Sequence, residues 1–447
     1  MNALKIKPLI LSIPIALIMG TGFYSCNIDP LVDPNNPSIE SIEADATIEE
    51  LNNLVTGMES GMRPSLDTYL DGVGIMGRDF YRFSGADPRF TSELLGKGES
   101  ELDNNTFYTV NPWGSRYRVV RNGWILRHAV DNTTADLTAE EKNGYRGFAK
   151  TIQAYQMLLN LNMTFEGGIR IDVEDPDNMG PILGDYHGCL TAIMTLLDEA
   201  KNDLINAGTE FRFTLSSGFT GFETPETFLQ FNRGIAARVM LYHEDYAGAL
   251  TALGESFINT GGGLQNGVWH VYSSGAGDIL NPLFYPLNSA PGGNARCAHN
   301  SFVDDAEPGD NRLSKAVLRT DTAFQDGLTS FYDVWVWQSS DAPICLIRNE
   351  ELILIEAEAK ARTGDAGGAV ANINIIRTSA GLGAYAGGMS EAELIDEILN
   401  QRRYSLFAEG HRWIDMRRTG KLGELPIDRV DDNVWTEYPI PYDELGL

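Results

Sequence analysis

Residues 348–382, RNEELILIEAEAKARTGDAGGAVANINIIRTSAGL, and residues 390–418, SEAELIDEILNQRRYSLFAEGHRWIDMRR, decide the fold of this 447-residue chain. In the first segment Leu352, Ile355 and Ala359 recur at helical spacing. The pair Gly364-Asp365 interrupts this pattern, because Gly permits a left-handed stop and Asp caps a following helix. The apolar positions then resume at Ala369. The segment therefore predicts two antiparallel helices, packed closely through their alanines.

The second segment predicts one longer helix that continues to Arg418. Along it Glu409, Arg412 and Asp415 are three residues apart, so the prediction places them on one helix face. These charges suit either an acid–base cluster or a structural ion-pair network. Arginine does not titrate near neutral pH, and an acid among arginines has a lowered pKa, which is the wrong direction for a general acid. The residue types therefore favour the structural network.

Five short motifs in the last hundred residues carry a family resemblance. They are Arg348-x-x-Glu351, Ala357-Glu358-Ala359, Asn374-x-x-Arg377 with Ala380-Gly381-Leu382, Glu409-Gly410-x-Arg412-x-x-Asp415-x-x-Arg418, and Tyr438-Pro439-Ile440-Pro441. In order and spacing they resemble the SusD/RagB family, the outer-membrane nutrient-binding lipoproteins of Bacteroidetes-type bacteria. The chain departs from the family pattern at Gln401 and Ser405, where glutamates are usual. Both positions are expected in the ion-pair network.

The charge of the chain excludes one class of function. The formal net charge is -28, while 43% hydrophobic and 21% charged residues are ordinary for a folded protein. Such an acidic surface argues against binding to a nucleic acid backbone. We expect a folded body from residue 46 to residue 447.

The N-terminus predicts export. Residues 1–25 combine two lysines with an apolar stretch too short to span a membrane, as in a signal peptide. Cys26 follows Ser25 and is the predicted lipidation site; ordinary signal-peptidase cleavage nearby and an uncleaved anchor are the alternatives. Residues 26–45 are rich in Pro, Asn and acids and predict a flexible tether. Cys189, Cys297 and Cys345 form no C-x-x-C pair, so free thiols are expected ahead of one disulfide.

Helical periodicity predicts most of the remaining chain. A capping box at Thr47 starts a helix that ends between residues 61 and 64. Residues 66–112 lose this period and predict a long aromatic-rich loop. Further helices are expected at about 113–129, 138–165, 190–206, 225–242 and 245–258.

An internal repeat supports this reading. Ala237, Asp245, Gly248 and Ala249 match Ala357, Asp365, Gly368 and Ala369 at an offset of 120 residues. Repeated helical hairpins predict a mostly α, tetratricopeptide-like scaffold. The single domain would then consist of a helical part (46–260), a loop-rich insertion (261–343) with a short strand near residues 331–337, and a C-terminal helical repeat with its tail (344–447).

No catalytic motif is present. The six histidines are scattered, and the sequence contains no H-E-x-x-H, no G-x-S-x-G and no P-loop. A carboxylate pair of a glycosidase is not identifiable from sequence, because its members meet only in space. The acidic residues between 304 and 310 favour a solvated loop over a metal site. We therefore expect no enzyme, no metal and no cofactor.

Binding through aromatic loops is the better-supported function. Aromatic rings stack on the apolar faces of sugars, and planar polar side chains bond sugar hydroxyls. The predicted ligand-binding residues lie in the two aromatic-rich regions and are Arg78, Tyr81, Trp269, Tyr272 and Tyr285.

The resemblance implies a partner and a place in the cell. Proteins of the family are lipid-anchored at the outer membrane and act with a TonB-dependent transporter of the SusC type, which the tetratricopeptide-like face would contact. The ligand would be an oligosaccharide, with a peptide as the alternative. A glycan hydrolase is the competing hypothesis from a different functional class.

Overall fold

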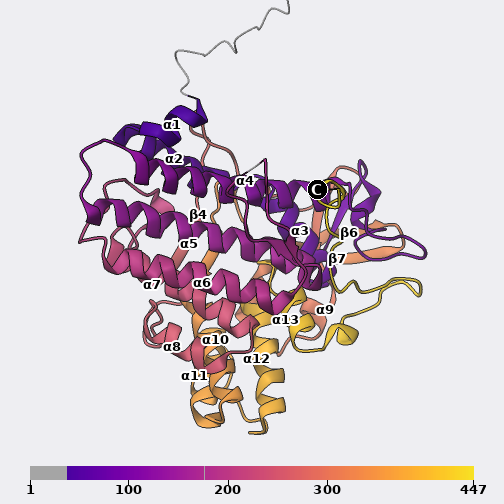
Figure 1. Cartoon of the computed structure of the whole chain (residues 1–447). Coiled ribbons are helices and arrows are strands. Elements are labelled where there is room, and N and C mark those ends of the chain that lie inside the picture. Colours follow the sequence, from indigo (N-terminus) through magenta and orange to yellow (C-terminus); the bar gives the residue numbers. More distant parts are fainter. Residues whose placement is uncertain (1–37, 176, 447) are drawn as a thin grey trace, which may run out of the picture.

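Helices build most of the computed structural model, which describes residues 38–175 and 177–446 (Figure 1). Helices that follow one another along the chain pack as neighbours in a layered stack. In stacking order they are α2 (Ile48–Gly61), α4 (Phe107–Asn132), α5 (Ala139–Thr164), α6 (Tyr186–Ile205), α7 (Pro225–Tyr242), α8 (Tyr246–Gly254), α10 (Asn349–Arg362), α11 (Ala366–Ser379) and α12 (Glu391–Ser405). The prediction of a mostly α protein built from helical hairpins is confirmed.

The two predicted hairpins repeat the same turn chemistry. Asp245 caps α8 by accepting a hydrogen bond from the Gly248 amide at 2.8 Å. Asp365 caps α11 by accepting one from the Gly368 amide, also at 2.8 Å. Because α8 also packs against α10, the two hairpins are joined into one scaffold. The internal repeat is confirmed, although α8 ends at Gly254 rather than at Ile258.

Part of the strand structure, labelled β6 and β7 in Figure 1, lies to one side of the helical stack. Four strands form an antiparallel sheet in the order β1 (Phe80–Ser84), β5 (Asn294–Ala298), β7 (Leu328–Val334) and β6 (Ala316–Gln325). The short helix α9 (Ser301–Asp304) follows β5. Two-stranded sheets pair β2 (Ile169–Arg170) with β3 (Ile182–Leu183), and β4 (Gly267–His270) with β8 (Ile344–Arg348). β7 confirms the strand predicted near residues 331–337.

The prediction of one long loop over residues 66–112 is wrong. This segment contains α3 (Leu66–Met76) and β1, and α4 begins at Phe107 rather than at Trp113, with Pro112 inside it. Most of α3 is buried, so its apolar residues are not confined to one face and give no amphipathic signal. Its glycines are explained by close packing, since a Cβ on Gly72 would meet the Tyr438 hydroxyl at 2.2 Å.

The predicted tether over residues 26–45 is also wrong where the structure describes it. Ile39–Asp45 form helix α1, which packs against α4. Side chains and backbone at the end of α4 fix it in place: Asn132 Nδ2 donates to the Glu43 carbonyl at 2.9 Å, and Asp45 accepts from the Thr134 amide at 2.8 Å. The signal peptide prediction (1–25) and Cys26 lie outside the described residues.

The long helix predicted from residue 390 to residue 418 is broken in the middle. α12 ends at Ser405, and α13 (Arg412–Arg418) begins after a turn in which Ala408 and Gly410 have φ values of 64° and 83°. Glu409 therefore precedes α13 and does not share a helix face with Asp415, as had been predicted. Glycine suits position 410, because a residue without a Cβ adopts the left-handed backbone conformation at no steric cost.

The charges of this region form a buried ion-pair network, as the residue types predicted. Asp415 pairs with Arg402 at 2.6 Å and with Arg418 at 2.9 Å, and Arg418 also pairs with Glu358. Burial alone would raise the pKa of Asp415, yet the two guanidiniums hold it below its usual range. The departures from the family pattern lie at the edge of this network: Ser405 accepts from Arg312 at 3.0 Å, and Gln401 donates to Glu397 at 2.8 Å.

The three described cysteines, Cys189, Cys297 and Cys345, are free thiols. No helix among residues 38–175 and 177–446 has both the length and the apolar composition that a membrane span requires.

Candidate functional site

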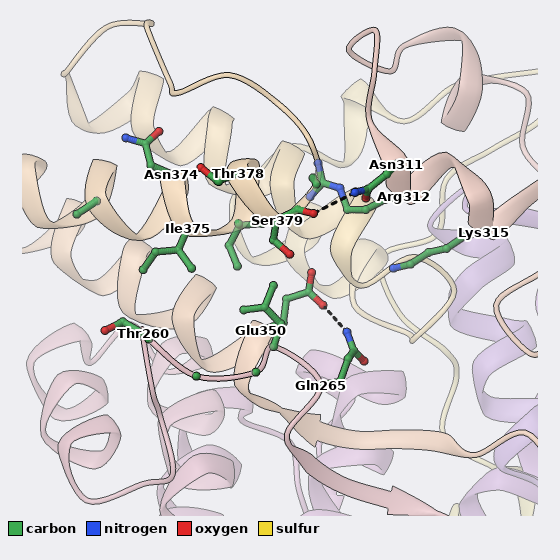
Figure 2. A pocket seen from close by; sticks show the side chains of 17 residues that line it. Thr260, Gln265, Asn311, Arg312, Lys315, Glu350, Asn374, Ile375, Thr378 and Ser379 are labelled. Atoms are coloured by element: carbon green, nitrogen blue, oxygen red, sulfur yellow. Dashed lines mark hydrogen bonds between the residues drawn. The ribbon is translucent and has the colours of Figure 1, made fainter.

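Several cavities open among the described residues, including one of about 840 Å³ beside the half-buried Trp435 of the C-terminal tail. Two others lie between the helical stack and the loop-rich insertion, from which three of the predicted ligand contacts come. The larger, of about 900 Å³, lies between the Gly-rich loop after α8 (260–265), the 3-10 helix η4 (Asn311–Lys315) and the second half of α11 (Figure 2). The smaller, of about 540 Å³, lies between the end of α2, the 3-10 helix η3 (Ser217–Phe219), β4 and the loop that follows β4. It contains Trp269, and we call it the Trp269 pocket.

The larger cleft has polar walls but no aromatic ring in its lining. Figure 2 shows two of its internal hydrogen bonds, from Gln265 to Glu350 at 3.4 Å and from Asn311 to the Ser379 carbonyl at 3.0 Å. Its cations are already engaged, since Arg312 pairs with Asp310 at 2.6 Å and Lys315 donates to two backbone carbonyls of α12. The cleft therefore lacks the stacking surface that sugars favour.

Backbone geometry directs Trp269 into the smaller pocket. The pairing of β4 with β8 shifts register between Val268 and Trp269, and such a bulge re-aims the next side chain. Val268 is fully buried, whereas Trp269 is half-buried and is one of the residues that line the cavity. Gly218 allows η3 to approach β4, because a Cβ there would lie 2.0 Å from the Trp269 carbonyl oxygen.

Three charged groups surround the ring, and two of them neutralise each other. Arg63, just beyond the end of α2, pairs with Asp278 and donates to the Val271 carbonyl at 2.9 Å. Asp278 also accepts from Ser273 at 2.8 Å, and these contacts lower its pKa although burial opposes them. The third group, Glu59, accepts hydrogen bonds from the Ser216 amide at 3.1 and 3.3 Å.

Glu59 is an unusual acid in an otherwise apolar helix position. Its side chain follows Leu51 and Val55 at four-residue spacing on the buried face of α2, and the residue is 9% exposed. Burial raises the pKa of its carboxyl group. Among the described residues no cation lies within ion-pair distance of it, although Arg63 favours its charged form from further away.

Two more residues, His270 and Tyr272, follow Trp269 in the chain and are buried at or near the pocket. Tyr272, a predicted ligand contact, is only 5% exposed, and the Arg63 guanidinium lies 5.6 Å from its ring centroid. His270 is buried in the pocket wall, and burial together with Arg116 and Arg63 lowers its pKa to about 3. This histidine is therefore neutral at physiological pH.

The other predicted contacts lie elsewhere. Arg78 is 1% exposed and donates to backbone carbonyls that include those of Pro426 and Asn433, so it fastens the C-terminal tail to the start of β1. Tyr81 is buried in β1, where its ring stacks on Phe83 at 5.5 Å. The positions of these two residues do not support the ligand contacts predicted for them, because packing and intramolecular bonds leave them no free surface.

Tyr285 is half-buried beside the sheet. The Arg296 guanidinium lies 4.5 Å from its ring centroid, and Arg82 donates to its hydroxyl at 3.4 Å. Both arginines also pair with the buried Asp71. Of the five predicted residues, Trp269 alone lines either of the two cavities, and Tyr272 lies next to Arg63, which lines the same cavity as Trp269.

The polar groups of the pocket were not predicted from the sequence. Arg63 and Asp278 are 215 residues apart, and no spacing rule links them. Glu59 could have been identified from the sequence as a candidate, because an acid on the buried face of a predicted helix needs hydrogen bonds or a counter-charge to offset its burial. The acidic loop after β5 offers no metal centre: among the described residues no cluster of His, Cys, Asp or Glu is arranged to hold a metal ion.

Comparison with known proteins agrees with this architecture. A sequence profile described as the SusD family matches residues 332–439. A SusD-like protein P38 of Formosa agariphila is 31% identical over 145 residues, and the alignment spans 29% of each chain. The chain thus matches less than a third of the length of this curated relative.

Solved structures share the fold over almost the whole chain. A surface glycan-binding protein A from Bacteroides thetaiotaomicron superposes with a TM-score of 0.67 at 16% identity, covering 89% of this chain and 96% of that one. A putative sugar binding protein from Bacteroides vulgatus gives 0.65 at 20% identity, covering 90% and 96%. A laminarin binding SusD-like protein gives 0.62 at 17% identity, covering 89% and 97%.

The solved structures define the fold as that of the SusD-type helical proteins. Within this fold, residues 332–439 match the profile of the SusD family.

Proposed function

We propose that this protein is a cell-surface, non-catalytic binding protein that captures an oligosaccharide and delivers it to a TonB-dependent outer-membrane transporter of the SusC type. In this proposal Cys26 carries the lipid anchor, and the tetratricopeptide-like face of the scaffold contacts the transporter. The ligand binds in the Trp269 pocket. The match of residues 332–439 to the SusD family profile supports the role, and two structural neighbours are themselves described as laminarin binding and surface glycan-binding.

One observation carries the assignment of the site. The half-buried Trp269 ring forms part of the wall of a 540 Å³ cavity that also presents a carboxylate and several hydroxyl groups. A ring of this kind stacks on the apolar face of a sugar, while the polar groups bond its hydroxyls. The larger cleft offers polar groups without a ring.

The test is calorimetric titration of the soluble protein (27–447) with a panel of neutral oligosaccharides of different linkage. We expect saturable binding of one glycan class. Trp269→Ala should weaken it by about tenfold or more, as the loss of roughly 1–2 kcal/mol of stacking requires. Trp269→Phe keeps a ring and should retain most of the affinity.

The matched control is Trp124→Ala, which removes a half-buried ring of α4 that does not line the pocket. Product analysis accompanies each titration, because Glu59 and Asp278 place two carboxylates in one cavity. Glycan turnover would overturn the non-catalytic assignment. Equal losses of affinity in the Trp124 and Trp269 variants would overturn the site.

A further inference from the structure

The face of α2 that lines the Trp269 pocket offers acceptors to a ligand. Thr56 and Ser60 line the pocket, and each hydroxyl donates its hydrogen within α2, to the Asn52 carbonyl at 3.2 Å and to the Gly57 carbonyl at 3.3 Å. Their oxygen lone pairs are what remains for a ligand. The Glu59 carboxylate, when ionised, also only accepts. This face therefore suits a ligand group that donates hydrogen bonds.

The charged side chains that line the pocket leave a net negative charge. Arg63 and Asp278 neutralise each other, and Arg63 also donates a hydrogen bond to the Val271 carbonyl. Glu59 stays without an ion-pair partner among the described residues. The chain as a whole carries a formal charge of -28. An anionic glycan, whose carboxylates or sulfates accept but do not donate, meets an unfavourable field in this pocket.

A carboxylate beside an indole ring is suited to an ammonium group. The ring face attracts the cation, and the carboxylate accepts its hydrogens in charge-assisted bonds. We propose that the Trp269 pocket selects an amino-sugar oligosaccharide, whose protonated amine pairs with Glu59. The proposal rests on the proposed function and narrows it to a class of glycan.

A glycan fits these groups better than a basic peptide. A lysine side chain brings one donor group on an apolar stem, whereas an amino sugar adds hydroxyl donors on either side of its ammonium. Those hydroxyls match the acceptors of Thr56 and Ser60, and the pyranose face matches the Trp269 ring. Binding of a basic peptide is therefore treated as an outcome of the test.

The experiment compares two ligands with the same sugar backbone and linkage that differ at the nitrogen, which is a charged amine in one and a neutral acetamide in the other. One is the β-1,4-linked hexamer of glucosamine, and the other is its N-acetylated counterpart. Calorimetry in a slightly acidic, low-salt buffer keeps the free amines protonated. We expect the glucosamine hexamer to bind about tenfold more tightly, which is the effect of one charge-assisted hydrogen bond.

Variants of Glu59 assign this preference to one group. Glu59→Gln should reduce the ratio of the two Kd values to about one, since glutamine keeps an acceptor for the Ser216 amide but has no charge. Glu59→Asp keeps the charge and should keep a preference. Glu210→Gln, an exposed position outside the pocket, changes the net charge equally and should leave the ratio unaltered.

Acidification provides a second readout. The preference should fall as the pH drops through the pKa of Glu59, which burial has raised. The other charged or titratable groups lining the pocket do not mimic this effect: Arg63 stays charged, the pKa of Asp278 is lowered, and that of His270 is about 3.

The outcomes separate the two proposals. If neither hexamer nor any other glycan binds, the proposed function itself fails. Equal or tighter binding of the N-acetylated hexamer, tight binding of an oligogalacturonate, or tighter binding of oligolysine would overturn the amino-sugar inference. Retention of the preference in a folded Glu59→Gln protein would overturn the role of Glu59.

Discussion

Buried ion pairs stabilise the packing of the C-terminal helices. Asp415 is 3% exposed, and its carboxylate pairs with Arg402 and Arg418 at the junction of α12 and α13. Both guanidiniums are themselves buried, so neither has water to replace a lost partner. The network therefore holds two short helices in register with α10, which supplies Glu358.

Asp415→Asn should destabilise the protein by about 3–5 kcal/mol, because it leaves buried positive charge uncompensated. Urea unfolding of the variant and the wild type gives the difference in free energy. Asp131→Asn is the matched control: it removes the carboxylate of an exposed pair with Arg146, whose loss should cost less than about 1 kcal/mol. Similar small losses in both variants would contradict the structural role of Asp415.

At the residue scale, sequence reasoning succeeds where neighbours in the chain are also neighbours in space. The charges near residues 402–418 could be assigned to a structural network because arginines and acids crowd one short segment. Arg78 and Tyr81 were predicted to face a ligand because an aromatic and basic composition looks the same on a surface and in a core. Their burial comes from the C-terminal tail and from the sheet, which are distant in sequence.

The helical hairpin is the element that the chain uses twice. In each copy an Asp caps the second helix through the amide of a Gly three residues later. A Cβ on Gly248 or Gly368 would lie 2.2 or 2.1 Å from the Oδ2 atom of the capping Asp. Glycine is thus required where the carboxylate folds back over the first turn, which explains why both copies carry it.

Two neighbouring glycines of α11 should respond differently to alanine. Gly367→Ala should stabilise the protein by up to about 1 kcal/mol, because alanine lowers the entropy cost of the helix and its Cβ meets Asp365 only at 3.9 Å. Gly368→Ala should show no such gain, since displacing the cap costs about 1 kcal/mol. Thermal unfolding of the two variants distinguishes these effects. A gain in both would show that the Asp365 cap contributes little.

Elements with a clear period could be predicted, and elements without one could not. α2 and α7 begin at capping residues that the sequence identified, and their apolar stripes follow the helical repeat. α3 is buried on nearly every side, and α4 contains a proline near its start. Neither α3 nor the first turns of α4 could therefore be predicted from an amphipathic pattern. In the loop-rich insertion β5 could not be predicted because its partner β1 lies far earlier in the chain. β6 pairs with the next strand, β7, but the register shift between Leu318 and Ala323 interrupts the alternating pattern.

At the scale of the whole molecule, the helical stack brings distant segments to one cavity. The end of α2, η3, β4 and the following loop are separated by as many as 215 residues, yet together they enclose the Trp269 pocket. Sequence could identify Trp269 as a candidate, since it lies in an aromatic insertion. It could not identify Glu59 as lining the same pocket, because the link runs through the packing of β4 against η3 and the hydrogen bond from Ser216 to Glu59.

Hydrogen–deuterium exchange with and without the tightest-binding glycan tests the central claim, that the Trp269 pocket is the ligand site. The account predicts protection of backbone amides in residues 214–219 and 269–278, and none in Trp269→Ala at the same glycan concentration. The cleft of Figure 2 is an internal comparison, with its own reporters in residues 260–265 and 371–380. Protection confined to that cleft would contradict the account and move the ligand to the larger cavity.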